Sequence, residues 1–99
     1  MRVVVVKRTR AEAGDIARRY EGERPGRGEV FLDAVADALR SIGEHPLAFA
    51  VWPDLTPTVP PLRRYVMRRF PYALGYVVHP DHVRVAVLTH MHRLPGYWR

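Results

Sequence analysis

The amino-acid sequence predicts one α+β domain in which a helical hairpin packs on a small, mostly antiparallel sheet. Three observations lead to this expectation: a run of valines near the N-terminus, two successive amphipathic helical patterns, and three strand-like segments in the C-terminal part. Their order is β-α-α-β-β-β, and 99 residues suit one hydrophobic core, so we expect one domain over residues 1–99. Helices on one face of the sheet leave the other face to be polar, functional or covered by a partner.

The N-terminal segment predicts a strand over residues 2–8 and a helix over residues 10–20. Four valines in succession, without a breaker, are typical of a strand buried on both faces, so we expect an interior strand. Thr9 and Glu12 have the spacing of a capping box, in which two side chains satisfy free amides at the start of a helix. Apolar side chains then recur at spacings of three and four and form the expected buried face: Ala13, Ile16, Ala17 and Tyr20.

A second helix is expected over residues 29–42, after a turn at 21–28 that contains three glycines and one proline. Gly43 directly follows the last apolar residue of the pattern and is predicted to form a left-handed C-terminal cap. Two helices joined by so short a turn form an antiparallel hairpin. The apolar stripe of the second helix consists of Phe31, Val35, Ala38, Leu39 and Ile42.

The C-terminal part predicts a long loop and then three strands. Five prolines lie in the loop at residues 45–61, where we expect one short extended piece at residues 49–52, because proline cannot donate a ladder hydrogen bond. Strands are expected over residues 62–70, 72–79 and 83–90, with Pro80 and Asp81 forming the turn of a hairpin between the last two. In the last strand one face should hold Val83, Val85 and Val87, and the other Arg84, Ala86, Leu88 and His90.

The chain is strongly basic, since 16 lysines and arginines against 10 acidic residues give a net charge of +6. Such a charge favours an acidic partner, either nucleic acid or an acidic protein segment, although a solvated basic surface is the simpler alternative. The absence of cysteine excludes disulfides and thiol chemistry. No apolar stretch resembles a signal peptide or a membrane span, so we expect a soluble, cytoplasmic protein with no membrane partner.

One candidate for function is a basic cluster in the first C-terminal strand, formed by Arg63, Arg64, Arg68 and Arg69. These side chains could face a phosphate backbone. On a strand, however, Arg64 and Arg68 share one face and the other two arginines share the opposite face, so all four cannot contact one phosphate chain. Half of them would then be edge charges that discourage aggregation.

The histidines of the C-terminal part are a second candidate, and His90 and His92 would share a strand face. No cysteine and no nearby carboxylate completes a ligand set, so we predict no metal site and no cofactor. A general acid–base role fits better, because imidazole titrates near neutral pH and could accept the proton of a ribose 2′-hydroxyl. A structural or partner-contacting role is the simpler alternative.

Two segments carry a resemblance to a known family. The pair Arg63-Arg64 precedes Phe70-Pro71-Tyr72, and near its end the chain has His90-Met91-His92-Arg93-Leu94-Pro95 followed by Tyr97-Trp98. In this order and spacing they resemble the RelE/ParE toxins of bacterial type II toxin–antitoxin systems. The resemblance covers nearly the whole chain, but only residues 63–98 are specific. It implies a RelE/ParE-like fold, a growth-inhibiting activity, and a cognate antitoxin that neutralises the toxin in a hetero-oligomer.

The resemblance leaves two alternatives for the target. The RelE-like branch cleaves messenger RNA on the ribosome, whereas the ParE-like branch poisons DNA gyrase and is not a nuclease. RelE-like nucleases carry a catalytic arginine directly after the strand tyrosine that Tyr72 matches, but this chain has Ala73 there, and arginines replace the lysines of the preceding strand. We therefore favour the ParE-like function. The alternatives are a ribosome-dependent endoribonuclease and a non-toxic basic module that binds an antitoxin or nucleic acid.

Residue types and resemblance together name the candidate site residues. For a nuclease they are Arg93, His90, His92, Arg64 and Tyr97. For a binding surface they are Arg63, Arg64, Arg68, Arg69, Arg93 and Trp98. Arg93 matches the second catalytic arginine of the nuclease branch, whereas Tyr97 lies near the C-terminal tyrosine position without matching its spacing. Tyr97 and Trp98 could stack on a base or seal the edge of the core.

Overall fold

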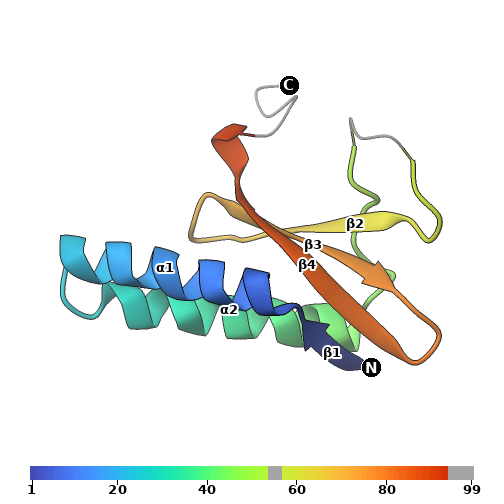
Figure 1. Cartoon of the computed structure of the whole chain (residues 1–99), viewed down its shortest axis with the longest axis horizontal. Coiled ribbons are helices and arrows are strands. Elements are labelled where there is room, and N and C mark those ends of the chain that lie inside the picture. The colour runs from blue at the N-terminus through green and yellow to red at the C-terminus, as the bar shows by residue number, and fades with distance from the viewer. Residues whose placement is uncertain (54–56, 94–99) are drawn as a thin grey trace.

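The backbone follows the predicted order of elements. The computed structural model describes residues 1–53 and 57–93, apart from the side chain of Arg93. The elements are β1 (Arg2–Val5), α1 (Lys7–Glu23), α2 (Arg27–Glu44), β2 (Leu62–Val66), β3 (Tyr72–Val78), β4 (His82–His90) and the 3-10 helix η1 (Met91–Arg93). The two helices lie side by side as a hairpin against the sheet (Figure 1). The predicted α+β class, helical hairpin and β-α-α-β-β-β order are therefore confirmed.

The sheet has the strand order β1-β4-β3-β2, with β1 parallel to β4 and the other two pairs antiparallel. The predicted interior position of the first strand is wrong, because β1 is an edge strand that ends at Val5. Val3 and Val5 pack against the core, whereas Val4 between them is 38% exposed. The valine run therefore reflects the strand preference of β-branched residues together with burial on one face only.

The first helix begins at Lys7, so the predicted capping box of Thr9 and Glu12 is wrong. The N-cap is Val6, which makes no side-chain cap hydrogen bond. Val6 still has extended backbone angles, and its N–H donates to the carbonyl oxygen of Val85 in β4 at 3.0 Å. The helix therefore starts directly where the chain leaves the sheet. Thr9 consequently lies inside the helix and is only 2% exposed.

Glycines permit tight geometry at both ends of α2. Gly26 precedes the helix with a φ of 87°, and the Glu21 carboxylate accepts its backbone N–H at 3.0 Å. Gly43 does not form the predicted left-handed cap, since it lies within α2. A Cβ at Gly43 would be 2.9 Å from Val3 Cγ2, so this glycine lets β1 pack closely on the helix. The Met1 ammonium group adds a hydrogen bond of 2.8 Å to the Gly43 carbonyl oxygen.

The core lies between the helical hairpin and one face of the sheet. Both predicted helical stripes are confirmed: Ala13, Ile16, Ala17, Phe31, Ala38 and Ile42 are buried, and Tyr20, Val35 and Leu39 pack against them. Aromatic rings fill one end of this core, where Phe31 makes edge contacts with Phe70 and Tyr72. In the part of the chain that the structure describes, no helix is both long enough and apolar enough to cross a membrane.

The face alternation predicted for the last strand fails beyond Val85. The β3–β4 register shifts between Gly75 and Tyr76, which pair with Val87 and Val85. This β-bulge inserts one extra residue into β4 and reverses the faces that follow. Leu88 is therefore on the core side and 6% exposed, whereas Val87 lies opposite Gly75 on the outer face.

The loop after α2 covers part of that outer face. The extended piece expected at residues 49–52 is present as an antiparallel bridge between Val51 and Arg63. The Trp52 N–H donates to the Leu62 carbonyl oxygen at 2.8 Å, and the Trp52 ring packs over Gly75 and is 6% exposed. The sequence alone allowed the outer sheet face to be polar, functional or covered by a partner. In the structure, Trp52 covers part of this face.

Candidate functional site

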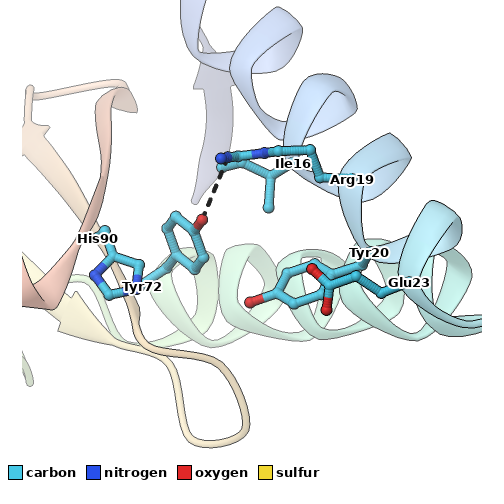
Figure 2. Close-up of a pocket in the computed structure, with 6 residues that line it drawn as sticks. All are labelled: Ile16, Arg19, Tyr20, Glu23, Tyr72 and His90. Atoms are coloured by element: carbon cyan, nitrogen blue, oxygen red, sulfur yellow. Dashed lines mark hydrogen bonds between the residues drawn. The ribbon is translucent and has the colours of Figure 1, made fainter.

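A cleft of about 340 Å³ lies between α1 and the ends of β3 and β4 that face it. The hairpin end of the helices projects beyond the sheet (Figure 1), so the last turns of α1 form one wall of this cleft. Figure 2 shows the residues that line it: Ile16, Arg19, Tyr20, Glu23, Tyr72 and His90. An adjoining hollow of about 260 Å³ is additionally lined by Glu12, Asp15, Leu88 and Thr89.

Tyr72 stands at the centre of the cleft. It is the first residue of β3 and pairs with His90, the last residue of β4, so both side chains project from the same sheet face. Their rings meet edge to face with centroids 5.1 Å apart. Across the cleft the guanidinium of Arg19 donates a long hydrogen bond of 3.5 Å to the Tyr72 hydroxyl (Figure 2). The site therefore joins a helix to two strand ends.

The two predicted histidines are adjacent in space. The rings of His90 and His92 have centroids 4.6 Å apart, and the His92 backbone N–H donates to His90 Nδ1 at 3.1 Å. An Nδ1 that accepts a hydrogen bond places the proton of a neutral imidazole on Nε2. This arrangement holds the His90 ring in one orientation beside Tyr72.

Tyr20 lines the cleft from α1. Its ring contacts Phe31 and Phe70, and the Arg27 guanidinium lies 5.1 Å from the centroid of the Tyr20 ring in a cation–π arrangement. Burial, followed by the neighbouring Tyr72, raises the pKa of Tyr20 above its usual 10.0. Tyr20 is therefore a neutral hydroxyl near pH 7, able to donate a hydrogen bond but unsuited to act as a base.

The described walls of the cleft and the adjoining hollow carry more negative than positive charge. Three carboxylates line them, those of Glu12, Asp15 and Glu23, against the single guanidinium of Arg19. Glu12 has its own partner in Arg8, at 3.9 Å, and Asp15 pairs with Arg18. These two ion pairs offset part of the negative charge, so the described walls hold no excess of positive charge that would attract a phosphate chain.

The structure separates residues that the nuclease interpretation groups together. Arg64 pairs with Gly75, so its side chain lies on the sheet face away from the helices, whereas His90 lies on the helical face. Ala73, at the position where the nuclease branch has an arginine, is fully buried and offers no donor. Arg64 therefore cannot complete a site around His90 without crossing the sheet.

The basic cluster is also divided. Arg63 is half-buried and donates to the Phe49 carbonyl oxygen at 2.8 Å, so it fastens the loop after α2 to the sheet. The expectation that Arg68 and Arg69 lie on opposite faces of a strand is wrong, because β2 ends at Val66 and both arginines lie exposed on the bend that follows. The chain bends there because the Met67 and Phe70 side chains are buried and Pro71 precedes Tyr72.

Several predicted residues lie at or beyond the end of the described chain. Arg93 is the last residue of η1, its side chain is outside the described part, and Tyr97 and Trp98 lie outside the described residues. The residues that the structure describes include no group of three histidine, cysteine or acidic side chains placed to hold a metal ion. His79 and His82 instead stack with centroids 4.7 Å apart at the β3–β4 turn.

Sequence reasoning did not assign Arg19, Glu23 or Tyr72 to the site. Arg19 and Tyr72 are 53 positions apart, and nothing in the local pattern of either segment indicates their contact. The helical periodicity ended at Tyr20, whereas α1 runs to Glu23, and this last turn supplies part of the wall. Had the expected helix been extended to Glu23, it would have included the turn that lines the cleft.

The chain is similar to known proteins in its three-dimensional structure rather than in its sequence. No protein-family model matches the sequence, and no curated protein matches it. Among solved structures, the chain is similar to a chain from the chromosomal ParDE toxin–antitoxin system of P. aeruginosa, with a TM-score of 0.77 and 13% sequence identity. The similarity covers 91% of this chain and 95% of that chain. The fold that the sequence predicted, that of the RelE/ParE toxins, is thereby confirmed.

Proposed function

We propose that this protein is the toxin of a type II toxin–antitoxin pair and is neutralised by a cognate antitoxin in the cytoplasm. The observation that carries the proposal is the structural similarity to a chain of a ParDE toxin–antitoxin system over 91% of this sequence. Two features of the chain agree with it: the order of the motifs from Arg63 to Trp98 and the net charge of +6. A basic toxin is well matched to an acidic antitoxin segment that folds as it binds.

We further propose that the target is DNA gyrase and that the toxin acts as a poison without catalysis. A nuclease of this family would have to stabilise a dianionic transition state, and each preorganised donor at such a centre is worth roughly 10²–10³ in rate. Ala73 offers no donor, Arg64 and His90 lie on opposite sheet faces, and Arg19 is the one guanidinium among the described residues that line the cleft. These three observations favour binding over catalysis.

Binding a protein target requires fewer precisely placed side chains than stabilising a transition state. Arginine and aromatic side chains contribute much of the binding energy in protein interfaces. Arg68 and Arg69 lie exposed on the bend after β2, and Arg93, Tyr97 and Trp98 are among the last seven residues of the sequence. We assign these residues to the contact with gyrase or the antitoxin.

A messenger-RNA endoribonuclease is the second candidate, because Tyr72, His90 and Arg19 meet in one cleft. In that function a His90 or His92 imidazole would move the proton of the 2′-hydroxyl, and Arg93 would face the scissile phosphate. Nothing else in the described walls supplies a cation, so the candidate depends on Arg93.

Two reactions with the same purified chain distinguish the candidates. In the first, gyrase acts on supercoiled plasmid with ATP, and trapped double-strand cleavage is scored. In the second, programmed ribosomes are scored for a transcript cut at the decoding site. The proposal expects trapped cleavage complexes and intact transcripts. Codon-specific cutting without an effect on gyrase would replace it with the nuclease.

The antitoxin is tested by co-expression with the product of a neighbouring reading frame. We expect inducible growth arrest from this chain alone and relief of the arrest by a co-purifying partner. A chain that is harmless on induction and binds no neighbouring product would contradict the toxin assignment and leave a basic binding module.

A further inference from the structure

The charge of this protein is distributed unevenly between the helices and the sheet. Of the 10 acidic residues, four lie in α1 and four in α2, whereas the four strands contain none. The helices also hold seven of the 16 basic residues, five in α1 and two in α2, so together they are close to neutral. The net charge of +6 therefore comes from the rest of the chain, and the lysine, arginine or acidic residues of the strands are all arginines.

Three strand arginines, Arg2, Arg64 and Arg84, project from the outer sheet face, because their neighbours along each strand pack against the core. Arg2 and Arg84 are exposed, and Arg64 is half-buried. Within the part of the chain that the structure describes, none of the three side chains forms an ion pair or a hydrogen bond. One carboxylate lies nearby, that of Asp81, whose pKa is lowered by its hydrogen bond with His82 and further by the charge of Arg2. The outer face therefore offers three guanidinium groups to an external anion.

The strand register places these arginines along one diagonal of the sheet, which we call the arginine stripe. In β1 the residue level with Arg84 is two positions after Arg2, and in β2, beyond β3, the residue level with Arg84 is two positions before Arg64. Since β1, β4 and β2 run in the same direction, the two offsets add up to one straight line. With strands about 4.8 Å apart and residues about 3.3 Å apart along each strand, the stripe is about 20 Å long.

A linear polyanion suits the arginine stripe better than a single anion does. The Cα atoms of successive arginines are about 8 Å and about 12 Å apart, too far for all three side chains to meet on one phosphate. Duplex DNA presents a phosphate about every 3.4 Å of its axis on each strand, so it meets the three arginines in many registers. An acidic peptide would need carboxylates at matching intervals.

The aromatic side chains of the sheet favour a duplex over a single strand. Single-stranded nucleic acids are bound largely by stacking of their bases on exposed aromatic rings. The strand aromatics Tyr65, Tyr72 and Tyr76 all belong to the core side of the sheet, and Trp52 on the outer side is only 6% exposed. In a duplex the bases are already stacked, and binding needs only the phosphate contacts that arginines supply.

We propose that the outer sheet face binds the phosphate backbone of duplex DNA, without sequence preference, through the arginine stripe. With about three phosphate contacts, the dissociation constant should lie in the range typical of non-specific binding, roughly 10⁻⁴–10⁻⁶ M at physiological salt. The DNA would lie on the side of the sheet opposite to the cleft of Tyr72 and His90. This contact goes beyond the proposed gyrase target and is measured with the chain and DNA alone, so either proposal can fail without the other.

The test titrates a fluorescently labelled duplex of about 20 base pairs with the purified chain and follows anisotropy at several salt concentrations. For three phosphate contacts, the logarithm of the binding constant should fall with the logarithm of the salt concentration with a slope of about −2.7. Arg2→Gln, Arg64→Gln and Arg84→Gln should each weaken binding about fivefold and make the slope shallower by about 0.9. Arg40→Gln is the matched control, because it removes the same charge from the exposed side of α2, where Arg40 pairs with Asp37. It should leave both the affinity and the slope unchanged.

Two further probes and a charge-conserving variant complete the experiment. Single-stranded RNA of the same length and polyglutamate compete with the labelled duplex, and we expect both to compete more weakly than unlabelled duplex does. Arg84→Lys keeps the charge and should retain the slope, which separates loss of a phosphate contact from loss of folding; circular dichroism checks the fold of every variant. The proposal is overturned if the duplex does not bind at about 50 mM salt, if Arg40→Gln weakens binding as much as Arg84→Gln does, or if RNA or polyglutamate binds more tightly than the duplex.

Discussion

The ring of Trp52 lies directly over Gly75, so that a Cβ added to Gly75 would be 2.7 Å from Trp52 Cζ3 and 2.8 Å from Val87 Cβ. Contacts this short do not occur between real side chains. Gly75 is therefore the point where the loop after α2 and the bulged strand β4 both approach the centre of β3. The glycine creates the space that Trp52 fills, and the tryptophan shields this part of the outer sheet face.

Gly75→Ala should lower the free energy of unfolding by about 1–3 kcal/mol, because the methyl group overpacks a site between the Trp52 ring and the Val87 Cβ. Gly14→Ala in α1 is the matched control, since its Cβ would meet only Arg18 Nη1 at 3.6 Å. In a helix interior that change should instead stabilise by roughly 0.5–1 kcal/mol. Urea denaturation of both variants checks the pair; equal effects of the same sign would contradict this account of Gly75.

Periodicity within a segment allowed most of the fold to be predicted. The stripes of both helices could be recognised because each depends on spacings of three and four along one element, as with Phe31 and Ile42. The errors arose where another element decides the outcome. Val6 is held by Val85, which moved the helix start, and Gly43 accommodates Val3 rather than ending α2. The bulge in β4 has no local signal, since it depends on pairing with β3.

The candidate site was harder to predict for the same reason. His90 was identified from its residue type and its motif, but its neighbours Tyr72 and Arg19 come from distant segments. Arg64 was grouped with His90 because strand position alone does not say which face each side chain occupies across three strands. The faces are set by the strand pairing: Arg64 pairs with Gly75 and lies on the outer face, whereas His90 pairs with Tyr72 and lies on the helical face.

Tyr76 links the core to the loop after α2, so removing its hydroxyl should lower the free energy of unfolding by a measurable amount. Its hydroxyl donates to the Pro46 carbonyl oxygen at 2.7 Å. Tyr76→Phe leaves this acceptor unpaired, so we expect the free energy of unfolding at pH 7 to fall by about 1 kcal/mol. Tyr65→Phe is a comparison at a half-buried tyrosine for which the structure gives no hydroxyl bond of this kind, and thermal or urea denaturation measures both.

The contribution of Tyr76 to stability should be lost at alkaline pH. Burial raises the pKa of Tyr76 above 10.0, and the neighbouring Arg63 opposes this shift only in part. The folded state therefore prefers the protonated phenol, so the stabilisation is complete below pH 10 and is lost as pH rises through the folded-state pKa. Denaturation curves of wild type and Tyr76→Phe should converge above pH 10. A constant difference between pH 7 and pH 11 would contradict this assignment.

Thr9→Val should stabilise the protein in the absence of any ligand. Threonine and valine have nearly the same shape, and both are β-branched, so helix propensity changes little. The change removes a buried hydroxyl that has no partner among the described residues, and such a group typically costs about 1–3 kcal/mol. We expect a gain of about 1 kcal/mol in urea denaturation. A loss of stability would mean that Oγ1 is paired in solution.

Arg93→Ala should abolish toxicity with little effect on folding. Arg93 matches a functional position of the RelE/ParE family, so we expect its loss to affect activity; a residue without a role in folding usually changes stability by less than about 0.5 kcal/mol when it is truncated. Arg24→Ala, at an exposed arginine of the turn between the helices, is the control that should remain toxic. Growth after induction and the thermal midpoint are measured together. A large drop in the midpoint of Arg93→Ala would assign this residue a structural role.

His90→Asn separates a poison from a nuclease by removing the titrating group while keeping an acceptor for the His92 N–H. A gyrase poison needs no proton transfer, so this variant should trap cleavage complexes to within a few-fold of wild type. A nuclease that used His90 as general acid or base would lose about 10²–10⁴ in rate. Tyr72→Phe, which removes the hydroxyl facing Arg19 but keeps the ring against His90, completes the set. Retention of gyrase trapping by both variants supports the poison, and loss of toxicity in both, with transcript cutting lost in parallel, would assign the cleft to catalysis.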